Sequence, residues 1–321
     1  MCALFGWLDY KGIVPYKILK KLTQALANAA EERGTDASGI SYVRDGKITI
    51  YKRPKPAHKL RFNIPVDTKA VMGHTRMATQ GDKSQNFNNH PFSGAAGDIS
   101  FAFAHNGVLW NDRELRHDKK LPDTHIRTDS YIAVQLLESQ NKLDFDSLRY
   151  MAETVEGNFT FTVLDQNNSL YIIKGSNPMC LLHFESLGLY IYASTESIMK
   201  NALRKVGLYK FASEKIEVVE GNILCINKMG GITRSEFEPK LYRSKYMSWY
   251  GDNESYYGVH EELLLAYCGC YGVDSSDVEL LLEYGYTCDE IEDMLMDYDL
   301  IHDTVRAVKG EDCYDDFLME I

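Results

Sequence analysis

The chain has 321 residues, of which 45% are hydrophobic and 25% are charged, and its formal net charge is −11. These proportions are ordinary for a globular protein, no apolar run approaches the ~20 residues that a membrane helix needs, and the start lacks the pattern of a secretion signal. The seven cysteines are scattered and odd in number, which argues against a disulfide framework and favours a reducing cytoplasm.

The first part of the chain is expected to form strands around two helices. Apolar residues recur at helical spacing from Tyr16 to Glu31. A second helix is expected at 129–137, with Thr128 as its N-cap. Asp45-Gly46 predicts a hairpin turn. The strands expected in this part are residues 2–7, 40–43, 48–51, 70–72 and 99–104.

The part from residue 159 to 226 is rich in β-branched and aromatic residues and therefore predicts mostly strands. Thr195 is expected to cap a helix that runs to Val206. Gly221 lies in a further hairpin signal. The strands expected here are residues 159–164, 169–173, 180–184, 189–192, 216–219 and 223–226. Together the two parts indicate sheets that are covered by helices.

The composition changes at residue 241. Residues 241–321 contain four basic and 20 acidic residues, a net charge of −16, which leaves +5 for residues 1–240. We therefore expect two domains, 1–240 and 241–321, and no direct nucleic-acid binding by the acidic one. Capping-box patterns that begin at Ser276 and Thr287, with Gly285 between them, predict a helical hairpin. Its inward side chains would be Val278, Leu281, Leu282, Ile291, Met294 and Leu295.

The second residue, Cys2, could supply both a nucleophile and a base. Initiator methionine is usually removed before a small residue, which would leave Cys2 with a thiol and a free α-amino group. The thiolate is the reactive form of cysteine, and an α-amino group with a pKa near ~8 can accept its proton. The alternative is that Cys2 merely begins a buried strand, because free cysteine is commonly buried.

Five polar, mostly glycine-containing motifs follow Cys2. They are RGTDASG at 33–39, GHTRMATQG at 73–81, NNHPF at 88–92, AHNGV at 104–108 and TDS at 128–130. Their residues and order resemble the class II glutamine amidotransferase domain, one of the N-terminal nucleophile (Ntn) hydrolases, as in the glutaminase half of glucosamine-6-phosphate synthase and amidophosphoribosyltransferase. The resemblance covers roughly residues 2 to 230. It implies an α+β fold, a four-layer αββα sandwich of two antiparallel sheets between helical layers, with a small helical appendage.

The resemblance also assigns catalytic roles. Cys2 matches the nucleophile, and its α-amino group would be the base. Asn106 and Gly107 match the oxyanion hole, with the Asn106 side-chain amide and the Gly107 N–H as donors. The alternative for this pair is a tight turn after a strand, since Asn-Gly is a common hairpin signal.

Further residues match the glutamine-binding positions of the family. Arg76 matches the residue that binds the substrate carboxylate, and Asp129 matches the one that binds its ammonium group. Alone, Arg76 would be read as part of a surface ion pair and Asp129 as a favourable residue at a helix N-terminus. Thr79 and Gly81 match positions whose backbone lines the pocket, and Arg33 matches an arginine close to the nucleophile.

Two positions depart from the family pattern. Met77 stands where many relatives have tryptophan, and Gln80, a supporting residue of the site, stands where they often have histidine. In those relatives this region couples glutamine binding to closure of the site and to passage of ammonia. His74, His90 and His105 fit no compact zinc spacing, and the resemblance implies neither a metal nor another cofactor.

The resemblance implies an enzyme that hydrolyses glutamine to glutamate and ammonia through a thioester on Cys2. A synthetase or transferase partner would use the ammonia, since residues 241–321 are too few for the acceptor domains of the family. Two alternatives keep the fold. An Ntn hydrolase of another amide is disfavoured by Arg76 and Asp129, which together suit a free amino acid. A non-catalytic regulatory module is disfavoured by Cys2 and Asn106, although retention of Met1 would favour it.

Overall fold

The computed structural model describes residues 2–240, 264, 265, 268, 273–286, 290, 291, 294 and 298–310. Contacts divide the chain into two compact units, Met1–Arg243 and Ser244–Ile321. This division lies close to the boundary after residue 240 that the change in charge predicts. None of the helices in the described part of the chain combines the length and the hydrophobicity that crossing a bilayer requires.

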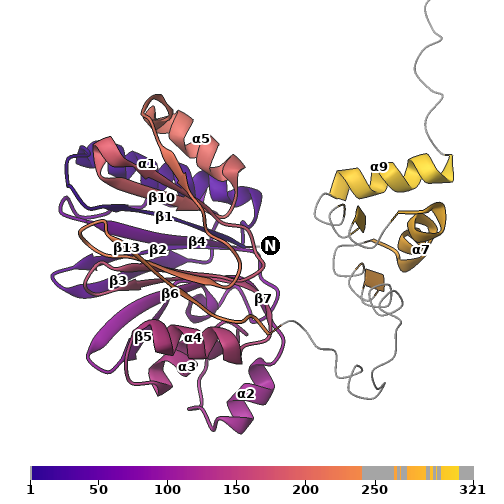
Figure 1. Ribbon diagram of the computed structural model, residues 1–321, viewed down its shortest axis with the longest axis horizontal. Coiled ribbons are helices and arrows are strands. Elements are labelled where there is room, and N and C mark those ends of the chain that lie inside the picture. Colours follow the sequence, from indigo (N-terminus) through magenta and orange to yellow (C-terminus); the bar gives the residue numbers. More distant parts are fainter. Residues whose placement is uncertain are drawn as a thin grey trace, which may run out of the picture. The chain divides into compact units, whose positions relative to one another are not determined.

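The N-terminal unit is built on two antiparallel sheets (Figure 1). The strand order is β11-β9-β10-β1-β4-β2-β3 in the first sheet and β13-β12-β8-β7-β6-β5 in the second. The first sheet consists of β1 (Ala3–Asp9), β2 (Ala37–Arg44), β3 (Lys47–Arg53), β4 (Ala70–Arg76), β9 (Cys180–Phe184), β10 (Leu189–Ala193) and β11 (Glu214–Ile216). The second consists of β5 (Phe92–Ala96), β6 (Ile99–Leu109), β7 (Gly157–Asp165), β8 (Leu170–Lys174), β12 (Asn222–Ile226) and β13 (Ile232–Glu236).

Helices cover the outer face of each sheet (Figure 1). The α-helices of this unit are α1 (Tyr16–Ala29), α2 (Asp112–Asp118), α3 (Tyr131–Ser139), α4 (Phe145–Thr154) and α5 (Glu196–Val206). Short 3-10 helices lie at Ala30–Glu32, Ala57–Lys59, Asn86–Asn88, Glu185–Leu187 and Leu208–Lys210. α1 and α5 share a buried core with the first sheet, and α3 and α4 share one with the second. This arrangement confirms the predicted α+β fold with four αββα layers.

The central strand β1 is buried on both faces. Phe5 and Trp7 point to the core under α1 and α5, whereas Leu4 and Leu8 point to the core between the sheets. Successive side chains of a strand point to opposite faces, so a strand between helices and a second sheet is apolar at nearly every position. The Trp7 Nε1–H donates to the Thr23 hydroxyl at 2.9 Å, which satisfies the polar atom of the buried indole.

Two local signals of the N-terminal unit act as predicted. Asp45 and Gly46 have φ of 49° and 70° and join β2 to β3, as the favoured hairpin turn requires. The Thr195 side chain accepts a hydrogen bond from the Ile198 N–H at 3.2 Å, where α5 begins. The structure also contains elements that the sequence analysis did not predict, namely α2, α4, β5 and β13.

Two predictions for this unit are wrong. Thr128 is not the N-cap of α3, because the helix begins at Tyr131 with Ser130 at the N-cap position. The turn at Gly221 does not join two paired strands, because β11 pairs with β9 in the first sheet and β12 pairs with β8 and β13 in the second. A turn signal indicates a change of chain direction, whereas strand pairing depends on packing against distant neighbours.

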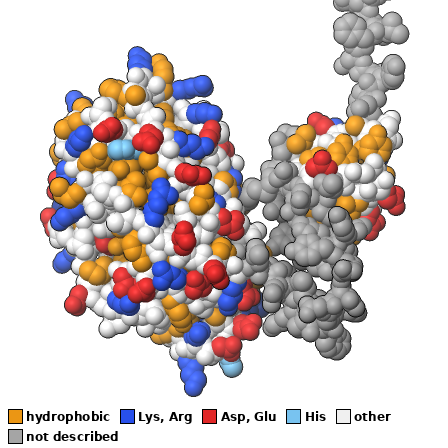
Figure 2. All heavy atoms as spheres, viewed as in Figure 1, with side chains coloured by type: hydrophobic (Ala, Val, Ile, Leu, Met, Phe, Trp, Pro, Cys, Tyr) orange, Lys and Arg blue, Asp and Glu red, His pale blue; other side chains and the backbone are white. Residues whose placement is uncertain are grey.

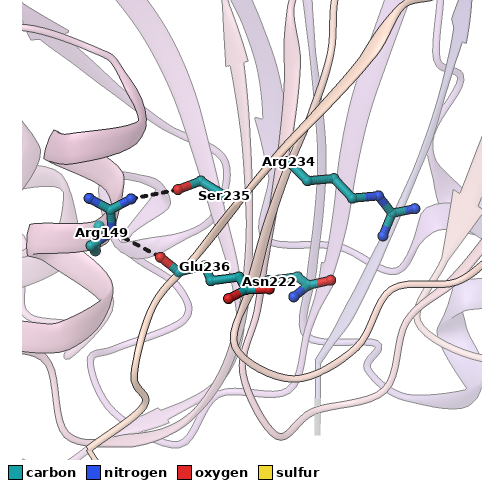
Figure 3. A pocket seen from close by; sticks show the side chains of 5 residues that line it. All are labelled: Arg149, Asn222, Arg234, Ser235 and Glu236. Carbon is teal, nitrogen blue, oxygen red and sulfur yellow. Dashed lines mark hydrogen bonds between the residues drawn. The ribbon is translucent and has the colours of Figure 1, made fainter.

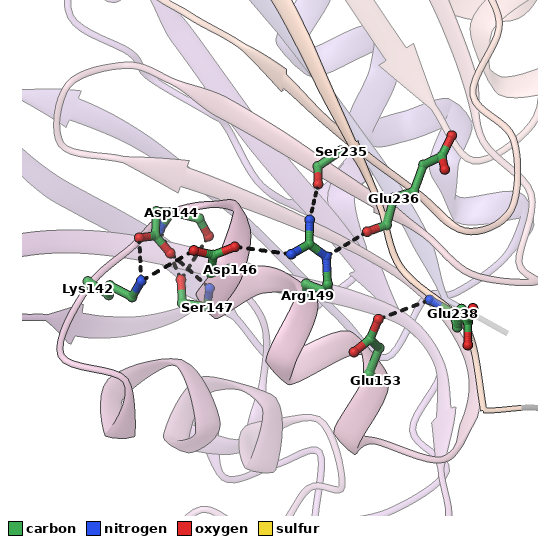
Figure 4. Close-up of polar contacts among 9 residues, drawn as sticks. All are labelled: Lys142, Asp144, Asp146, Ser147, Arg149, Glu153, Ser235, Glu236 and Glu238. Carbon is green, nitrogen blue, oxygen red and sulfur yellow. Dashed lines mark hydrogen bonds and ion pairs between the residues drawn. The ribbon is translucent and has the colours of Figure 1, made fainter.

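Helix α4 is tied to β13 by Arg149 (Figure 4). The Arg149 Nε–H donates to the Glu236 carbonyl oxygen at 2.9 Å and its Nη2–H donates to the Ser235 hydroxyl at 2.6 Å. The helix starts with a reciprocal cap, in which the Asp144 carboxylate accepts from the Ser147 N–H and the Ser147 hydroxyl accepts from the Asp144 N–H, each at 2.9 Å. These contacts fix the outer layer that covers the second sheet.

Charges of both signs are mixed on the surface of the N-terminal unit (Figure 2). On the face shown, lysine and arginine side chains lie beside aspartate and glutamate, with apolar atoms between them. The basic side chains on this face therefore do not form a single patch. Such a surface gives no support for a nucleic-acid site on that face.

In the C-terminal unit, helix α7 (Ser275–Tyr284) begins and ends at defined caps. Asp274, not Ser276, is its N-cap, and the Asp274 carboxylate accepts from the Ser276 N–H at 2.9 Å. Gly285 ends the helix with φ of 114°, as predicted. The second predicted cap, Thr287, lies outside the described residues.

The C-terminal unit has a core of its own. A further helix, α9 (Tyr298–Lys309), contributes to it. The buried apolar side chains of this core are Leu264, Cys268, Val273, Val278, Leu281, Ile291, Met294, Ile301 and Val305. The predicted inward residue Leu282 packs against them and is partly buried, while Leu295 lies outside the described residues.

Candidate active site

Cys2 lies at the start of β1, beside the end of β4. Ala3 pairs with Thr75 across these two strands, so Cys2 and Arg76, which flank that pair, are neighbours at the same end of the sheet. Leu4 points to the core between the sheets, and Cys2 shares its face because side chains alternate along a strand. The thiol is thereby placed between the two sheets, at the end where β4 stops.

A narrow pocket lies beside Cys2. It is lined by Cys2, Arg76, Met77, Thr79, Gln80, His90, His105, Gly107, Thr128, Asp129 and Ser130. The first sheet, the second sheet, the loop after β4 and the segment before α3 all contribute to this lining. Residues that are far apart in the sequence, and that the sequence analysis selected one motif at a time, therefore meet at one place.

A wider hollow lies on the surface between α4 and β13 (Figure 3). It is lined by Arg149, Asn222, Arg234, Ser235 and Glu236. None of the sequence-predicted site residues lines it, and its Arg149 guanidinium is already bonded to Ser235 and Glu236. We therefore regard the pocket at Cys2, although it is smaller, as the candidate active site.

Cys2 is half-buried and is held from two sides. Its thiol donates to the Met77 carbonyl oxygen at 3.5 Å, and its own carbonyl oxygen accepts from the Arg33 Nε–H at 2.9 Å. Burial raises the pKa of the Cys2 thiol, although the nearby Arg76 guanidinium acts in the opposite direction. A thiol with a raised pKa needs a proton acceptor before it can act as a nucleophile near neutral pH.

Asn106 and Gly107 lie inside strand β6, so the alternative reading of this pair as a turn is wrong. Gly107 has φ of +142°, and a Cβ at this position would lie 1.8 Å from the Asn158 carbonyl oxygen, so only glycine fits. The Asn106 Nδ2 group is buried and has no hydrogen-bond partner among the described residues. A buried donor without an acceptor is costly, and the cost is removed when a bound molecule supplies the acceptor.

Arg76 is buried, and its guanidinium is fixed by three hydrogen bonds. Nη1 donates to the Asn89 side-chain oxygen at 2.7 Å, and Nη2 donates to the carbonyl oxygens of Gln80 and Gly81 at 2.5 and 3.1 Å. A guanidinium has five N–H donors. The contacts to described residues therefore leave the Nε–H and one Nη1–H, which lie on different sides of the guanidinium and can each donate to an oxygen of a ligand.

Asp129 is buried, lines the same pocket and lies just before α3. Its Oδ2 accepts from the Leu109 N–H at 2.7 Å, and its Oδ1 accepts from the Ser130 hydroxyl at 3.4 Å. The short bond fixes one carboxylate oxygen, while the long bond leaves the other with spare accepting capacity. A carboxylate in this state can bind an ammonium group.

The loop at 77–83 carries three of the predicted residues. Thr79 and Gln80 line the pocket, and the Gln80 Nε2–H donates to the Asp112 carboxylate at 3.3 Å. Gly81 has φ of +80°, and a Cβ there would lie 2.8 Å from the Arg127 carbonyl oxygen. Both features explain why the chain needs glycine at this point of the loop.

Asp36, from the 33–39 motif, fastens the same loop. Its carboxylate accepts from the Ala78 N–H at 2.9 Å and from Lys83 Nζ at 2.5 Å. Burial would raise the pKa of Asp36, but these two donors outweigh it and lower the pKa overall. Asp36 thus orders the loop that lines the pocket.

Two buried histidines, His90 and His105, line the pocket, and a third, His74, packs against His90. His74 donates from Nε2 to the His105 carbonyl oxygen at 2.9 Å, and the ring of His90 lies 4.2 Å from that of His74. Burial lowers the pKa of His74 to about 3 and lowers the pKa of His90 and His105 as well. The part of the chain that the structure describes contains no cluster of three or more metal-binding side chains.

Asn89 and Asn177 also support the site, although the sequence motifs indicate no role for either side chain. Asn89 accepts from Arg76, and the Asn177 Nδ2–H donates to the Asn106 carbonyl oxygen at 2.9 Å. Asn89 lies in the 88–92 motif, so its region carries a sequence signal. Asn177 lies in a loop between β8 and β9 without such a signal, and only the fold brings it to the site.

The pocket thus combines a thiol, a guanidinium and a carboxylate, and the unpaired amide of Asn106 belongs to the residue between His105 and Gly107 of its lining. Amide cleavage through a covalent intermediate needs a nucleophile and donors for the developing oxyanion. A free amino acid needs a cation for its carboxylate and an anion for its ammonium group. The arrangement of Cys2, Asn106, Arg76 and Asp129 meets these chemical requirements.

Comparison with known proteins gives a consistent result. Residues 1–155 match the family described as Glutamine amidotransferases class-II. A glutamine–fructose-6-phosphate aminotransferase (isomerizing) of Bacillus licheniformis is 32% identical over 193 residues, which cover 56% of this chain and 30% of that protein. The Staphylococcus aureus protein of the same name is 25% identical over 274 residues, which cover 83% of this chain and 42% of that protein. The chain thus spans less than half of the length of these relatives.

Among solved structures, a glutamine phosphoribosylpyrophosphate amidotransferase from B. subtilis has a similar fold. The TM-score is 0.57 at 21% sequence identity, and the match covers 76% of this chain and 50% of that one. At this identity the similarity establishes the fold.

Proposed function

This chain carries a class II glutamine amidotransferase domain in residues 1–155, and on that premise we propose that it hydrolyses the side-chain amide of glutamine to glutamate and ammonia. One observation carries the proposal. Cys2, Arg76, Gly107 and Asp129 line a single narrow pocket although they lie far apart in the sequence. A nucleophile, an oxyanion site and two opposite charges are the groups that glutamine hydrolysis needs.

Cys2 is the proposed nucleophile, after removal of Met1. Its α-amino group takes the thiol proton, and the thiolate attacks the carboxamide carbon. The Asn106 amide and the Gly107 N–H donate to the oxygen that becomes negative. The α-ammonium group returns the proton to the leaving nitrogen, the C–N bond breaks, and ammonia and a γ-glutamyl thioester result. Water then attacks the thioester, with the amine again as base, and glutamate and the free thiol are released.

Arg76 and Asp129 are proposed to bind the two charged ends of glutamine. The positive charge of Arg76 and its remaining donors suit the carboxylate, and the Asp129 oxygen that has only a long contact suits the ammonium group. The backbone of Thr79 would line the rest of the substrate, whereas Gly81 lies outside the pocket lining and holds the Arg76 guanidinium through its carbonyl oxygen. Arg33 holds the Cys2 carbonyl oxygen and so supports the position of the nucleophile.

We propose further that the ammonia is used by an acceptor enzyme. Hydrolysis of glutamine is useful to a biosynthetic reaction only if the ammonia reaches a second substrate. The curated relatives are named as aminotransferases, and more than half of their length is not matched by this chain. A partner protein that supplies the acceptor site is therefore part of the proposal.

The first test is glutamate release by the purified protein in the presence of glutamine, beside a Cys2→Ala variant. The intact mass of the same sample reports whether Met1 is present. We expect release by the wild type with Met1 removed and none by Cys2→Ala, because the variant lacks the nucleophile. Release that persists in Cys2→Ala would contradict the mechanism. An inactive wild type with Met1 removed would point to another amide substrate or to activation by the partner.

A second variant tests the oxyanion site. Asn106→Ala removes the unpaired donor, and we expect kcat to fall by about 10²–10³-fold while KM changes little. We expect a similar fall in kcat for Asn106→Asp, which keeps the shape of the side chain but loses the amide donor. A kcat within a few-fold of the wild-type value in both variants would exclude Asn106 from the oxyanion site.

A further inference from the structure

Asn89 joins Arg76 to the loop that lines the pocket. Asn89 is fully buried, its side-chain oxygen accepts from the Arg76 Nη1–H at 2.7 Å, and its Nδ2–H donates to the Lys83 carbonyl oxygen at 3.0 Å. One side-chain amide is therefore bonded both to the candidate carboxylate-binding residue and to the end of the 77–83 loop. Rotation of this amide would exchange its donor and acceptor and break both bonds.

Lys52, on the edge strand β3, fixes the backbone that carries Asn89. Its Nζ donates to the carbonyl oxygens of Asn89 and Pro91, the latter at 3.0 Å, and lies 4.9 Å from the centre of the Phe92 ring. The Lys52 carbonyl oxygen also accepts from the Asn86 Nδ2–H at 3.1 Å. The segment that holds Asn89 is thus attached to β3 at several points.

From these contacts we propose that Asn89 and Lys52 are positioning residues, which hold the Arg76 guanidinium in the orientation that binds the carboxylate of glutamine. The proposal rests on the proposed function of Arg76. Neither residue lines the pocket, so each would act through Arg76 and not by contact with the substrate. Lys52 holds the backbone at Asn89, the Asn89 side chain orients the Arg76 guanidinium, and the guanidinium binds the carboxylate of the substrate.

The surroundings of Lys52 fit this role better than a role in stability. The salt bridges of the described residues include none for Lys52, and the charged or titratable groups that face it are Arg76, His74 and His90. Burial, with the Arg76 charge in addition, lowers the pKa of Lys52 to about 8. A largely buried ammonium without a carboxylate is unfavourable for folding, which favours a role in holding the Asn89 backbone.

The test compares glutamine kinetics of the full-length wild type with two variants. Asn89→Leu removes both amide contacts at a similar side-chain size, and Lys52→Met keeps the apolar stem and removes the ammonium group. Lys47→Met is the matched control, because Lys47 lies on the same strand and is exposed. We expect KM for glutamine to rise about tenfold or more in both variants, as for a misplaced charged hydrogen bond, while kcat stays within about threefold and Lys47→Met resembles the wild type.

A second measurement does not depend on turnover. The guanidinium N–H signals of Arg76 can be followed by NMR, with assignment through an Arg76→Lys variant. We expect sharp signals in the wild type and broadened, faster-exchanging signals in Asn89→Leu and Lys52→Met. Should one variant fail to fold, the other decides.

The two measurements separate the positioning proposal from the proposed function. If the wild type is active, an unchanged KM in the folded variants would overturn the positioning role alone. A fall in kcat as large as the rise in KM would also overturn it. A wild type that does not use glutamine would remove the proposed function. In that case the Arg76 signals decide the positioning role, and signals that are unchanged in the variants would overturn it.

Discussion

At the scale of single residues, burial keeps the histidines around the pocket neutral. The rings of His74 and His90 are in contact, tilted by 32° to each other, and both histidines lie close to the Arg76 guanidinium. A second positive charge there would be desolvated and repelled, and for this reason their pKa values lie below the ordinary value near ~6.5. Neutral rings leave Arg76 as the cation of the pocket lining, which suits the binding of one carboxylate.

The lowered pKa of His74 predicts how the stability of the folded protein depends on pH. The pKa of His74 is about 3 in the folded protein and near ~6.5 in the unfolded chain. Between these pH values the unfolded chain binds more protons than the folded protein. The contribution of His74 to stability is therefore complete above pH ~6.5 and is lost as the pH falls towards 3. We expect His74→Gln to reduce the wild-type loss of unfolding free energy between pH 7 and pH 5 by about 2 kcal/mol.

Urea unfolding at the two pH values measures this difference. His117→Gln is the control, because the His117 side chain is 91% exposed and its replacement should leave the pH dependence unchanged. An identical pH dependence in wild type and His74→Gln would show that His74 is not held neutral by burial.

At the scale of secondary structure elements, local signals were reliable where the chain needs only its own neighbours. Thr195 starts α5, and Gly285 ends α7, as the sequence predicted. The prediction of Thr128 as an N-cap was wrong because its segment lines the pocket. In this segment Asp129 accepts a hydrogen bond from the Leu109 N–H of β6. A contact with a distant strand there took precedence over the local capping rule.

The cap of α5 gives a prediction at this scale. The Thr195 hydroxyl accepts from the Ile198 N–H and donates to Glu32 at 2.6 Å. We expect Thr195→Ala to lower the free energy of unfolding by about 1–2 kcal/mol, because the helix loses a cap. Ser197→Ala is a matched control, since Ser197 also donates to Glu32 but does not cap the helix, and it should cost less than ~0.5 kcal/mol. Equal losses of unfolding free energy in both variants would show that the hydrogen bond to Glu32, and not the helix cap, causes the effect.

At the scale of the whole molecule, each compact unit buries apolar side chains of its own. The three clusters of the N-terminal unit use residues 3–237, and the cluster of the C-terminal unit uses residues 264–308. A chain that ends after Arg243 would therefore keep the cores of the first unit and all proposed site residues.

Truncation tests this independence. We expect a chain that ends after Arg243 to unfold in one cooperative transition and to release glutamate at a rate within a few-fold of the full chain, because its cores are intact. Denaturant unfolding and glutamate release measure the two properties. An insoluble or inactive fragment would show that residues after 243 contribute to the folding or to the site of the first unit.

The sequence by itself determined most strands and helices, an arrangement of sheets covered by helices, and the motifs that contain the candidate site residues. It could do so because strand alternation, helix periodicity, turn residues and short motifs are properties of neighbouring residues. The match to a known family then placed these motifs in one fold. Cys2, Asn106 and Arg76 could therefore be named from the sequence with their roles as predictions.

Only the tertiary structure decided which distant segments meet. It carried the chain from the first sheet to the second at Gly221, brought Asn177 to Asn106, and joined Lys52 and Asn89 to Arg76. Strand pairing and buried polar contacts depend on the packing of elements that are remote in the sequence, and no local pattern encodes such partners.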